Sequence, residues 1–96
     1  MRIAWDLRKA HANQLKHHLT FEEARSLFER DINYLVIYDA EPSNDEDRFV
    51  AIGPIRRGII TVVFIEQTDD SIRIISARRA TGRERTLFRR HIGGST

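Results

Sequence analysis

The sequence predicts an α+β fold: two N-terminal helices, an antiparallel sheet of three to four main strands, and a C-terminal helix. Helix-start signatures stand near both ends of the chain, and between them lie runs of β-branched and aromatic residues separated by polar turns. Helices segregated from strands along the chain are typical of this class. A single layer of helices on one face would leave the other face open to a ligand or partner.

The N-terminal region predicts a first helix. Residues 1–5 alternate like a strand and are either a short edge strand or an anchored start. Asp6 suits the N-cap of a helix from Leu7 to about His17. The stripe expected to face the core is sparse in apolar residues and consists of Leu7, Ala10, Asn13 or Gln14, Leu15 and His18. This leaves a wide polar surface on the rest of the helix.

A second helix follows directly. Thr20 and Glu23 have the spacing of a capping box, in which each side chain accepts a hydrogen bond from the other residue's backbone N–H. The apolar residues recur at helical spacing and predict a buried stripe of Phe21, Ala24, Leu27 and Phe28. We expect a structural role for this helix.

Four segments rich in β-branched residues predict the strands 33–39, 48–53, 59–66 and 72–78. The acidic segment 40–47 is expected to be a mobile hairpin connection, and 54–58 and 67–71 are expected to be turns. The strand 59–66 is apolar on both faces, which is typical of a central strand covered on both sides.

The last predicted strand ends at a pair of arginines. Strand alternation places Arg78 on the face of Ile72 and Ile74, and Arg79 on the face of Ala77. The two guanidinium groups therefore point to opposite sides, and one is expected to close over a carboxylate. Guanidinium groups beside the N–H groups of a helix start suit phosphate or carboxylate.

A basic helix from about Gly82 to His91 is predicted next, with Thr81 and Glu84 at capping-box spacing and Gly93-Gly94 ending it. We expect it to dock on the sheet through Leu87, Phe88 and Ile92. The rest of its surface is positive because it carries Arg83, Arg85, Arg89 and Arg90.

Length and composition limit the possible functions. Ninety-six residues form one small domain, so we expect residues 1–96 to fold as one unit. The absence of cysteine excludes disulfides, thiolate metal sites and a cysteine nucleophile. The histidine spacing matches no zinc motif, so no metal or other cofactor is expected. Neither a membrane span of about 18 apolar residues nor a signal peptide is visible, which predicts a cytoplasmic protein.

The charge is divided unevenly between the two halves. Residues 1–54 contain seven Lys+Arg against ten Asp+Glu, a net −3, and residues 55–96 contain nine against four, a net +5. All basic residues of the second half are arginine, which binds phosphate through a planar fork. An acidic partner such as RNA, DNA or an acidic protein surface is one interpretation, and a solvated basic face is the other.

His17 and His18 follow Lys16 at the end of the first predicted helix. The helix dipole favours a protonated histidine there, which suits an anionic partner or a general acid, and the alternative is a C-terminal cap. Metal-free RNA cleavage requires a base, cationic groups around the phosphate and an acid. The sequence contains such a set, but so do most small basic domains.

Several segments together resemble the BrnT family, the toxin half of bacterial type II toxin-antitoxin pairs. The matching residues keep their order and spacing over nearly the whole chain: Trp5-Asp6, Lys9, Asn13, Lys16-His17, Thr20 to Ala24, Arg48-Phe49, Ala51 to Gly53, Arg73 to Ala80 and Glu84-Arg85. One position departs from the family pattern, because glycine usually follows Lys-His and this chain has His18.

The resemblance implies a RelE-like ribonuclease that inhibits translation when free. It also implies a BrnA-like antitoxin with a ribbon-helix-helix domain, and a toxin-antitoxin complex that represses its own operon. Arg78 or Arg79, with Arg48, would stabilise the scissile phosphate, and His17 or Glu84 would handle protons. Flanking RNA phosphates would be held by Lys9, Lys16, Arg57 and Arg83.

Two other interpretations remain open. The chain is alternatively a non-catalytic binding module, a decayed toxin, whose open sheet face and basic terminal helix dock onto an acidic antitoxin segment. The third interpretation is direct DNA binding by the basic helix. It is disfavoured because the apolar residues of that helix are needed for docking to the sheet and no helix-turn-helix pairing is visible.

Overall fold

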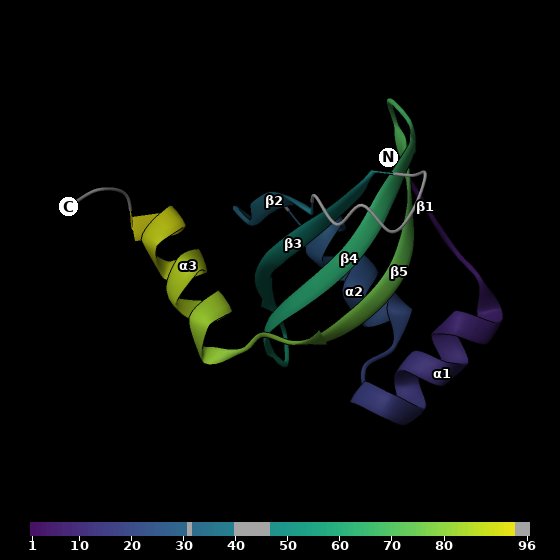
Figure 1. Cartoon of the computed structure of the whole chain (residues 1–96), viewed down its shortest axis with the longest axis horizontal. Coiled ribbons are helices and arrows are strands. Elements are labelled where there is room, and N and C mark those ends of the chain that lie inside the picture. Colours follow the sequence, from purple (N-terminus) through teal and green to yellow (C-terminus); the bar gives the residue numbers. More distant parts are fainter. Residues whose placement is uncertain (31, 40–46, 94–96) are drawn as a thin grey trace.

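The computed structural model describes residues 1–30, 32–39 and 47–93 of the chain. Within these ranges the α+β class is confirmed, with three helices and a five-stranded mixed sheet (Figure 1). The elements are β1 (Arg2–Trp5), α1 (Leu7–His17), α2 (Phe21–Glu29), β2 (Leu35–Asp39), β3 (Arg48–Ile55), β4 (Gly58–Thr68), β5 (Ser71–Arg79) and α3 (Gly82–Gly93). The expected mobile connection at 40–47 lies, except for Asp47, outside the described residues. None of the described helices combines the length and apolar character needed to cross a membrane.

The strand order is β1-β5-β4-β3-β2, so β4 is central, as its two apolar faces predicted. Strands β2 to β5 form the predicted antiparallel meander. The prediction of a wholly antiparallel sheet is wrong, because β1 pairs with β5 in parallel, with Ile3 opposite Ile72. Parallel neighbours require a long crossover connection, and here everything between β1 and β5 serves as one, so no local pattern reveals the pairing.

Strand β3 continues through Pro54 to Ile55, where the sequence predicted a turn beginning at Pro54. Because β2 pairs with β3 only as far as Ile52, β3 is an edge at Pro54 and the missing N–H interrupts no pairing with β2. The turn itself is short and consists of Arg56 and Arg57. Gly58 follows it with a φ of 123°, a conformation that suits glycine.

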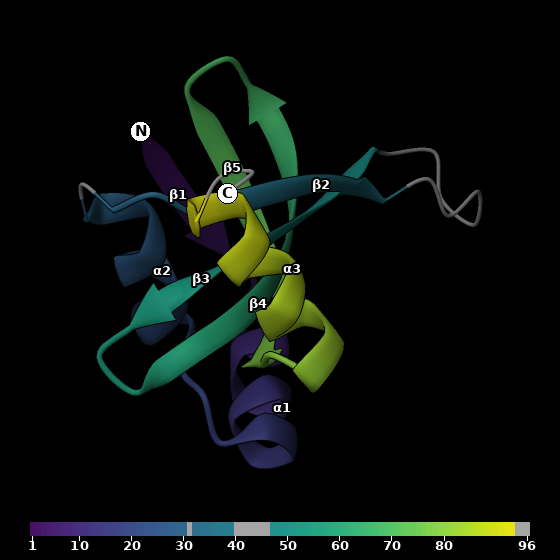
Figure 2. The same ribbon diagram turned by 90° about the vertical axis from the view of Figure 1, so that its left-hand side faces the viewer.

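The two faces of the sheet are covered by different helices (Figures 1 and 2). Helices α1 and α2 pack on one face, where the core includes Phe21, Leu27, Val62 and Ile74. Helix α3 lies on the other face, so the predicted single layer of helices is wrong. It meets the sheet at β3 through a small second cluster of Ile52, Ala80 and Phe88.

The expected docking of α3 is only partly confirmed. Phe88 is buried, but Leu87 is 36% exposed and Ile92 is 51% exposed. The helix contacts the sheet mainly through Phe88, so Leu87 and Ile92 remain partly exposed to solvent. Helix α3 is therefore attached to the sheet through little buried apolar surface.

The predicted starts of α1 and α2 are confirmed. Asp6 caps α1 by accepting hydrogen bonds from the N–H groups of Arg8 and Lys9, and Thr20 forms a complete capping box with α2. The predicted apolar stripe of α1 is largely wrong, because Leu7 is 80% exposed and Leu15 is 68% exposed. Helix α1 thus packs on the sheet with few apolar contacts.

A polar side chain, Asn13, fastens α1 to β5. Its buried amide nitrogen donates to the carbonyl oxygens of Leu19 at 3.0 Å and Ala77 at 2.9 Å, and its oxygen accepts from the Ala77 N–H at 3.0 Å. Strand β1 pairs with β5 only as far as Ile74. The Asn13 side chain therefore gives Ala77 the hydrogen bonds that a neighbouring strand would otherwise supply.

A β-bulge in β5 changes which residues face the core. The pairing of β4 with β5 shifts between Val63 and Phe64, and this leaves Ile75 without an opposite residue. Ile74 and Ala77 consequently both contribute to the core under α1 and α2. Strict alternation assigned these two side chains to opposite faces, so the predicted phase of the strand is wrong beyond the bulge.

Replacing Asn13 with alanine is expected to lower the free energy of unfolding by about 2–4 kcal/mol, because an N–H and two carbonyl groups lose their partners at a buried site. Urea unfolding followed by circular dichroism measures this loss. Gln14→Ala, at the exposed neighbouring position, is the matched control and should change the stability by less than about 0.5 kcal/mol. Equal effects of the two substitutions would contradict the role of Asn13.

Candidate active site

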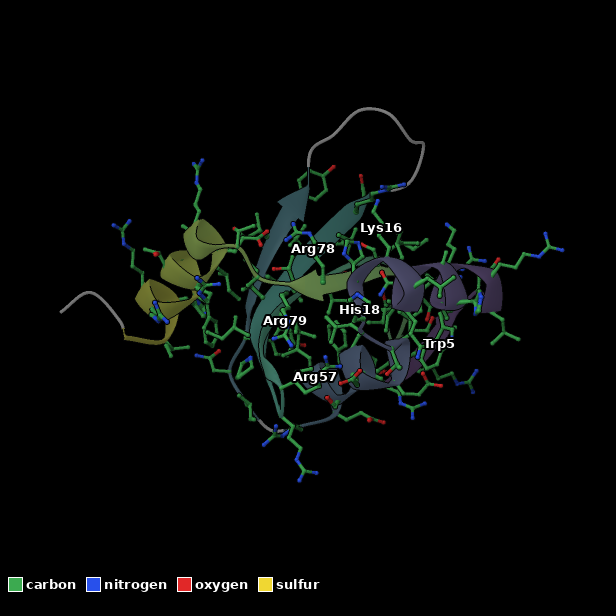
Figure 3. All side chains as sticks on the ribbon, turned by 90° about the horizontal axis from the view of Figure 1, so that it is seen from below. Trp5, Lys16, His18, Arg57, Arg78 and Arg79 are labelled. Atoms are coloured by element: carbon green, nitrogen blue, oxygen red, sulfur yellow. The ribbon has the colours of Figure 1, made fainter. Side chains whose placement is uncertain are left out.

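The end of α1, the β3–β4 turn and the end of β5 border an open basic cavity of about 540 Å³. It is lined by Lys16, His17, His18, Arg57, Arg78, Arg79 and Thr81. Figure 3 shows Lys16 and His18 of α1 facing the three labelled arginines. None of these lining residues is acidic, so the cavity suits an anion.

Arg78 is held by a bidentate ion pair with Glu84. Its Nη1 lies 2.7 Å from Oε1 of Glu84, and its Nη2 lies 2.9 Å from Oε2. Glu84 also accepts hydrogen bonds from the Thr81 N–H at 2.8 Å and from the Thr61 hydroxyl at 3.0 Å. One arginine of the pair thus closes over a carboxylate, as predicted. Arg78 lies on the α3 side of the sheet, opposite Thr61, because of the bulge in β5.

These donors lower the pKa of Glu84 to about 2, and the hydrogen bond from Arg78 is the largest cause. Partial burial opposes this shift, while the Thr81 N–H and the Thr61 hydroxyl add to it. The hydrogen bond to Glu84 in turn raises the pKa of Arg78. Glu84 is therefore ionised near neutral pH and fully engaged, so its chemical contribution is to hold Arg78 in position.

Arg79 points to the other face of the sheet, as predicted. Its guanidinium Nη1 lies 3.4 Å from the carbonyl oxygen of Arg57, and among the described residues it has no carboxylate partner. Arg57 is bound more tightly. Its Nη1 contacts both carboxylate oxygens of Glu23, at 3.1 and 3.0 Å, and the carbonyl oxygen of His18 at 2.9 Å. Arg57 ties the turn to both N-terminal helices, and Arg79 keeps its charge available.

His18 ends α1 in the left-handed conformation, with φ 59° and ψ 29°, and its N–H donates to the carbonyl oxygen of Gln14 at 2.9 Å. This is the position where the resembled family usually has glycine. Histidine adopts the glycine conformation here, at a cost of about 1 kcal/mol. Helix α1 therefore ends where the sequence predicted.

The expectation of a protonated His17 is contradicted. Burial is the largest cause that lowers the pKa of His17, and the charges of Lys16, Arg78 and His18 lower it further. Burial and the neighbouring cations both act against the helix C-terminus, which favours the protonated form. Because the neutral imidazole is favoured, His17 suits a general base better than an acid.

Four predicted site residues do not line the cavity. Glu84 reaches it only through its ion pair with Arg78, and the other three lie further away. Arg48 is opposite Ile65 on β4, about 13 Å along that strand from the partner of Arg78. Lys9 is on the same helix as Lys16, about 10 Å away along its axis. Arg83 is on α3 and lines a separate groove.

Two residues of the cavity were not predicted as site residues, namely His18 and Thr81. In the sequence, His18 stands directly after His17, and Thr81 stands at the junction that follows the arginine pair. Within the described residues, no group of three or more histidine and acidic side chains is arranged to hold a metal ion.

Glu84→Gln is expected to destabilise the fold by about 1–2 kcal/mol at pH 7, because Arg78 loses its charged partner. The folded pKa of about 2 is below the ordinary 4.5, so the ionised carboxylate stabilises the fold fully above pH 4.5. This contribution is lost as the pH falls from 4.5 towards 2. Urea unfolding at pH 7, 5 and 3.5 should show the gap between the two proteins narrowing, and a constant gap would contradict the ion pair's role.

Comparison with known proteins agrees with the resemblance. Residues 5–84 match a family described as the ribonuclease toxin BrnT of type II toxin-antitoxin systems. The crystal structure of the Brucella abortus ribonuclease toxin BrnT is similar, with a TM-score of 0.66 and 32% sequence identity over 84% of this chain and 97% of that chain. No curated protein sequence matches the chain. The chain therefore belongs to the BrnT family of ribonuclease toxins of type II toxin-antitoxin systems.

Proposed function

We propose that this chain is an endoribonuclease that cleaves RNA without a metal ion and inhibits translation when it is free of its antitoxin. The observation that carries the proposal is the basic cavity, in which His17 lies among Lys16, Arg78 and Arg79. Phosphodiester cleavage by the ribose 2′-hydroxyl requires a base and nearby cations. His17, whose pKa is lowered, can be the base, and the arginines beside it can be the cations.

In the proposed reaction His17 removes the proton of the 2′-hydroxyl, and the 2′-oxygen attacks the adjacent phosphorus. The bond from phosphorus to the 5′-oxygen breaks, and that oxygen takes a proton from water, which leaves a 2′,3′-cyclic phosphate and a 5′-hydroxyl end; the proton held by His17 is then released to solvent. Arg78 and Arg79 stabilise the charge that develops on the phosphate. Glu84 takes no part in proton transfer, because it stays ionised and bound to Arg78.

The remaining basic residues contact the RNA on either side of the scissile phosphate in this proposal. Lys16 and Arg57 line the cavity and bind the nearest phosphates. Lys9 and Arg83 bind phosphates further along the strand. We include Arg48 in this outer group, because its distance along the sheet corresponds to a few nucleotides rather than to the reacting phosphate.

We further propose that the fold is RelE-like, that the antitoxin is BrnA-like with a ribbon-helix-helix domain, and that the complex of the two represses its own operon through the antitoxin's DNA contacts. The site of action is the cytoplasm, where the RNA is. A second candidate function is a non-catalytic binding module. It is favoured by the ion pairs of Arg57 and Arg78, which serve the fold whether or not the cavity is catalytic.

Arg79→Ala is expected to lower RNA cleavage by about 10²-fold while leaving the fold intact, because Arg79 is exposed and has no carboxylate partner among the described residues. Loss of RNA after induction in a bacterial host, and cleavage of purified RNA in the presence of EDTA, measure the activity. Arg2→Ala removes the same charge at the opposite end of β5 and is the matched control.

Undiminished cleavage by Arg79→Ala, or by a folded protein in which Arg78 and Arg79 are both alanine, would refute the assignment of the site. Abolition by EDTA would refute metal independence. Tight antitoxin binding without cleavage by the wild-type chain, at high protein concentration, would favour the non-catalytic module.

The rate of cleavage is expected to rise with pH to a plateau, with a midpoint below the ordinary histidine pKa of 6.5, because the neutral form of His17 is the base. His17→Asn should lower kcat by about 10²- to 10⁴-fold and abolish this midpoint. Single-turnover cleavage measured between pH 5 and 8 tests both statements. An unchanged pH profile in the variant would exclude His17 as the base.

A further inference from the structure

A second hollow, of about 340 Å³, lies between α3 and the sheet face at β2 and β3. We call it the α3 groove. Its walls are mainly apolar and include Ile37 and Val50 of the sheet and Leu87 of α3. Ile37 is 37% exposed and Leu87 is 36% exposed. Large apolar side chains gathered around a groove on a small protein indicate a contact surface.

The surroundings of the groove extend this surface. Ile92, one turn beyond Phe88 on α3, is 51% exposed. Strand β2 is an edge of the sheet, and its Tyr38, which also lines the groove, is 54% exposed. Native proteins usually protect an edge strand with charges or cover it. A protein segment that lies along β2 and α3 would cover these side chains together.

The charges beside the groove identify the kind of segment. On α3, Arg83, Arg89 and Arg90 form no ion pair with any described residue. The one acidic side chain of the helix, Glu84, is occupied by Arg78. A second copy of the chain in a symmetric contact would bring arginines against arginines, and RNA would place phosphates on apolar walls. A protein segment with apolar and acidic residues fits both features.

The α3 groove is connected to the basic cavity by two residues. Thr81 lines both hollows. Glu84 lines the groove and binds Arg78, which lines the cavity. A segment seated in the groove and continuing over Thr81 would therefore cover one side of the cavity and exclude RNA from Arg78.

We propose that the α3 groove is the docking site of the antitoxin: an amphipathic antitoxin segment inserts apolar side chains between β2 and α3, sets acidic residues on the arginines of α3, and covers the Thr81 side of the cavity. This inference rests on the proposed function for its inhibitory consequence. The docking itself does not depend on catalysis.

Leu87→Asp tests the apolar part of the proposal, and Leu7→Asp is the matched control, because Leu7 is an exposed leucine on α1 away from the groove. The antitoxin is purified as its native complex with this chain, separated from the chain in denaturant, refolded, and titrated into each variant by calorimetry. Leu87→Asp should weaken binding at least tenfold, and Leu7→Asp should leave it unchanged. Arg89→Glu combined with Arg90→Glu, which alters only exposed side chains, should also weaken binding at least tenfold.

In cells, the Leu87→Asp chain should arrest growth and should no longer be relieved by the antitoxin. Unchanged antitoxin affinity of both groove variants would overturn the proposal. A dimer of the free wild-type chain that Leu87→Asp dissociates, seen by light scattering, would assign the groove to a second copy instead. Failure of the wild-type chain to arrest growth would count against the ribonuclease proposal alone, because calorimetry still decides the docking site.

Discussion

The hydrogen bonds between the Asn13 amide and Ala77 are the constraint on which the basic cavity depends. They join the last turns of α1 to the end of β5, at the point where β1 no longer pairs with that strand. Residues 16–18 follow within the next turn of the chain, and residues 78–79 follow immediately after Ala77. Both halves of the cavity are thus positioned by one buried side chain. A polar side chain can fix their relative position because its hydrogen bonds are directional.

The two capping-box glutamates have a second task in this molecule. Glu23 caps α2 and binds Arg57, and Glu84 caps α3 and binds Arg78. Each carboxylate therefore fixes a helix start and an arginine of the cavity at the same time. Arg79 is the cavity arginine left without such a partner among the described residues. The cavity thus keeps a rigid frame and an excess positive charge, which also disfavours protonation of a histidine inside it.

Local features of this fold were predictable, and features set by distant pairing were not. The helix starts follow from donors and acceptors three residues apart, and the central strand follows from its own apolar residues. The bulge at Ile75 depends on how β5 meets β4, so alternation gave the wrong phase beyond it. The buried role of Asn13 depends on contacts between α1 and β5. Five predicted site residues converge on the cavity, namely Lys16, His17, Arg57, Arg78 and Arg79. Arg48 does not, because it stands towards the other end of the sheet, and Arg83 does not, because it lines the α3 groove.

The limited burial of α3 against the sheet leaves apolar surface for a partner, which suits a protein of this family. Phe88 and the Glu84–Arg78 ion pair hold the helix at one side and at its start, while the apolar side chains near Phe88 remain exposed. A helix that buried all of its apolar residues would be more stable but would offer a partner only charges. The free chain can therefore fold with part of its apolar surface exposed, and it buries more apolar surface when a partner covers the groove. Since Glu84 belongs to both the groove and the cavity, whatever occupies the first is in contact with the residue that holds Arg78 in the second.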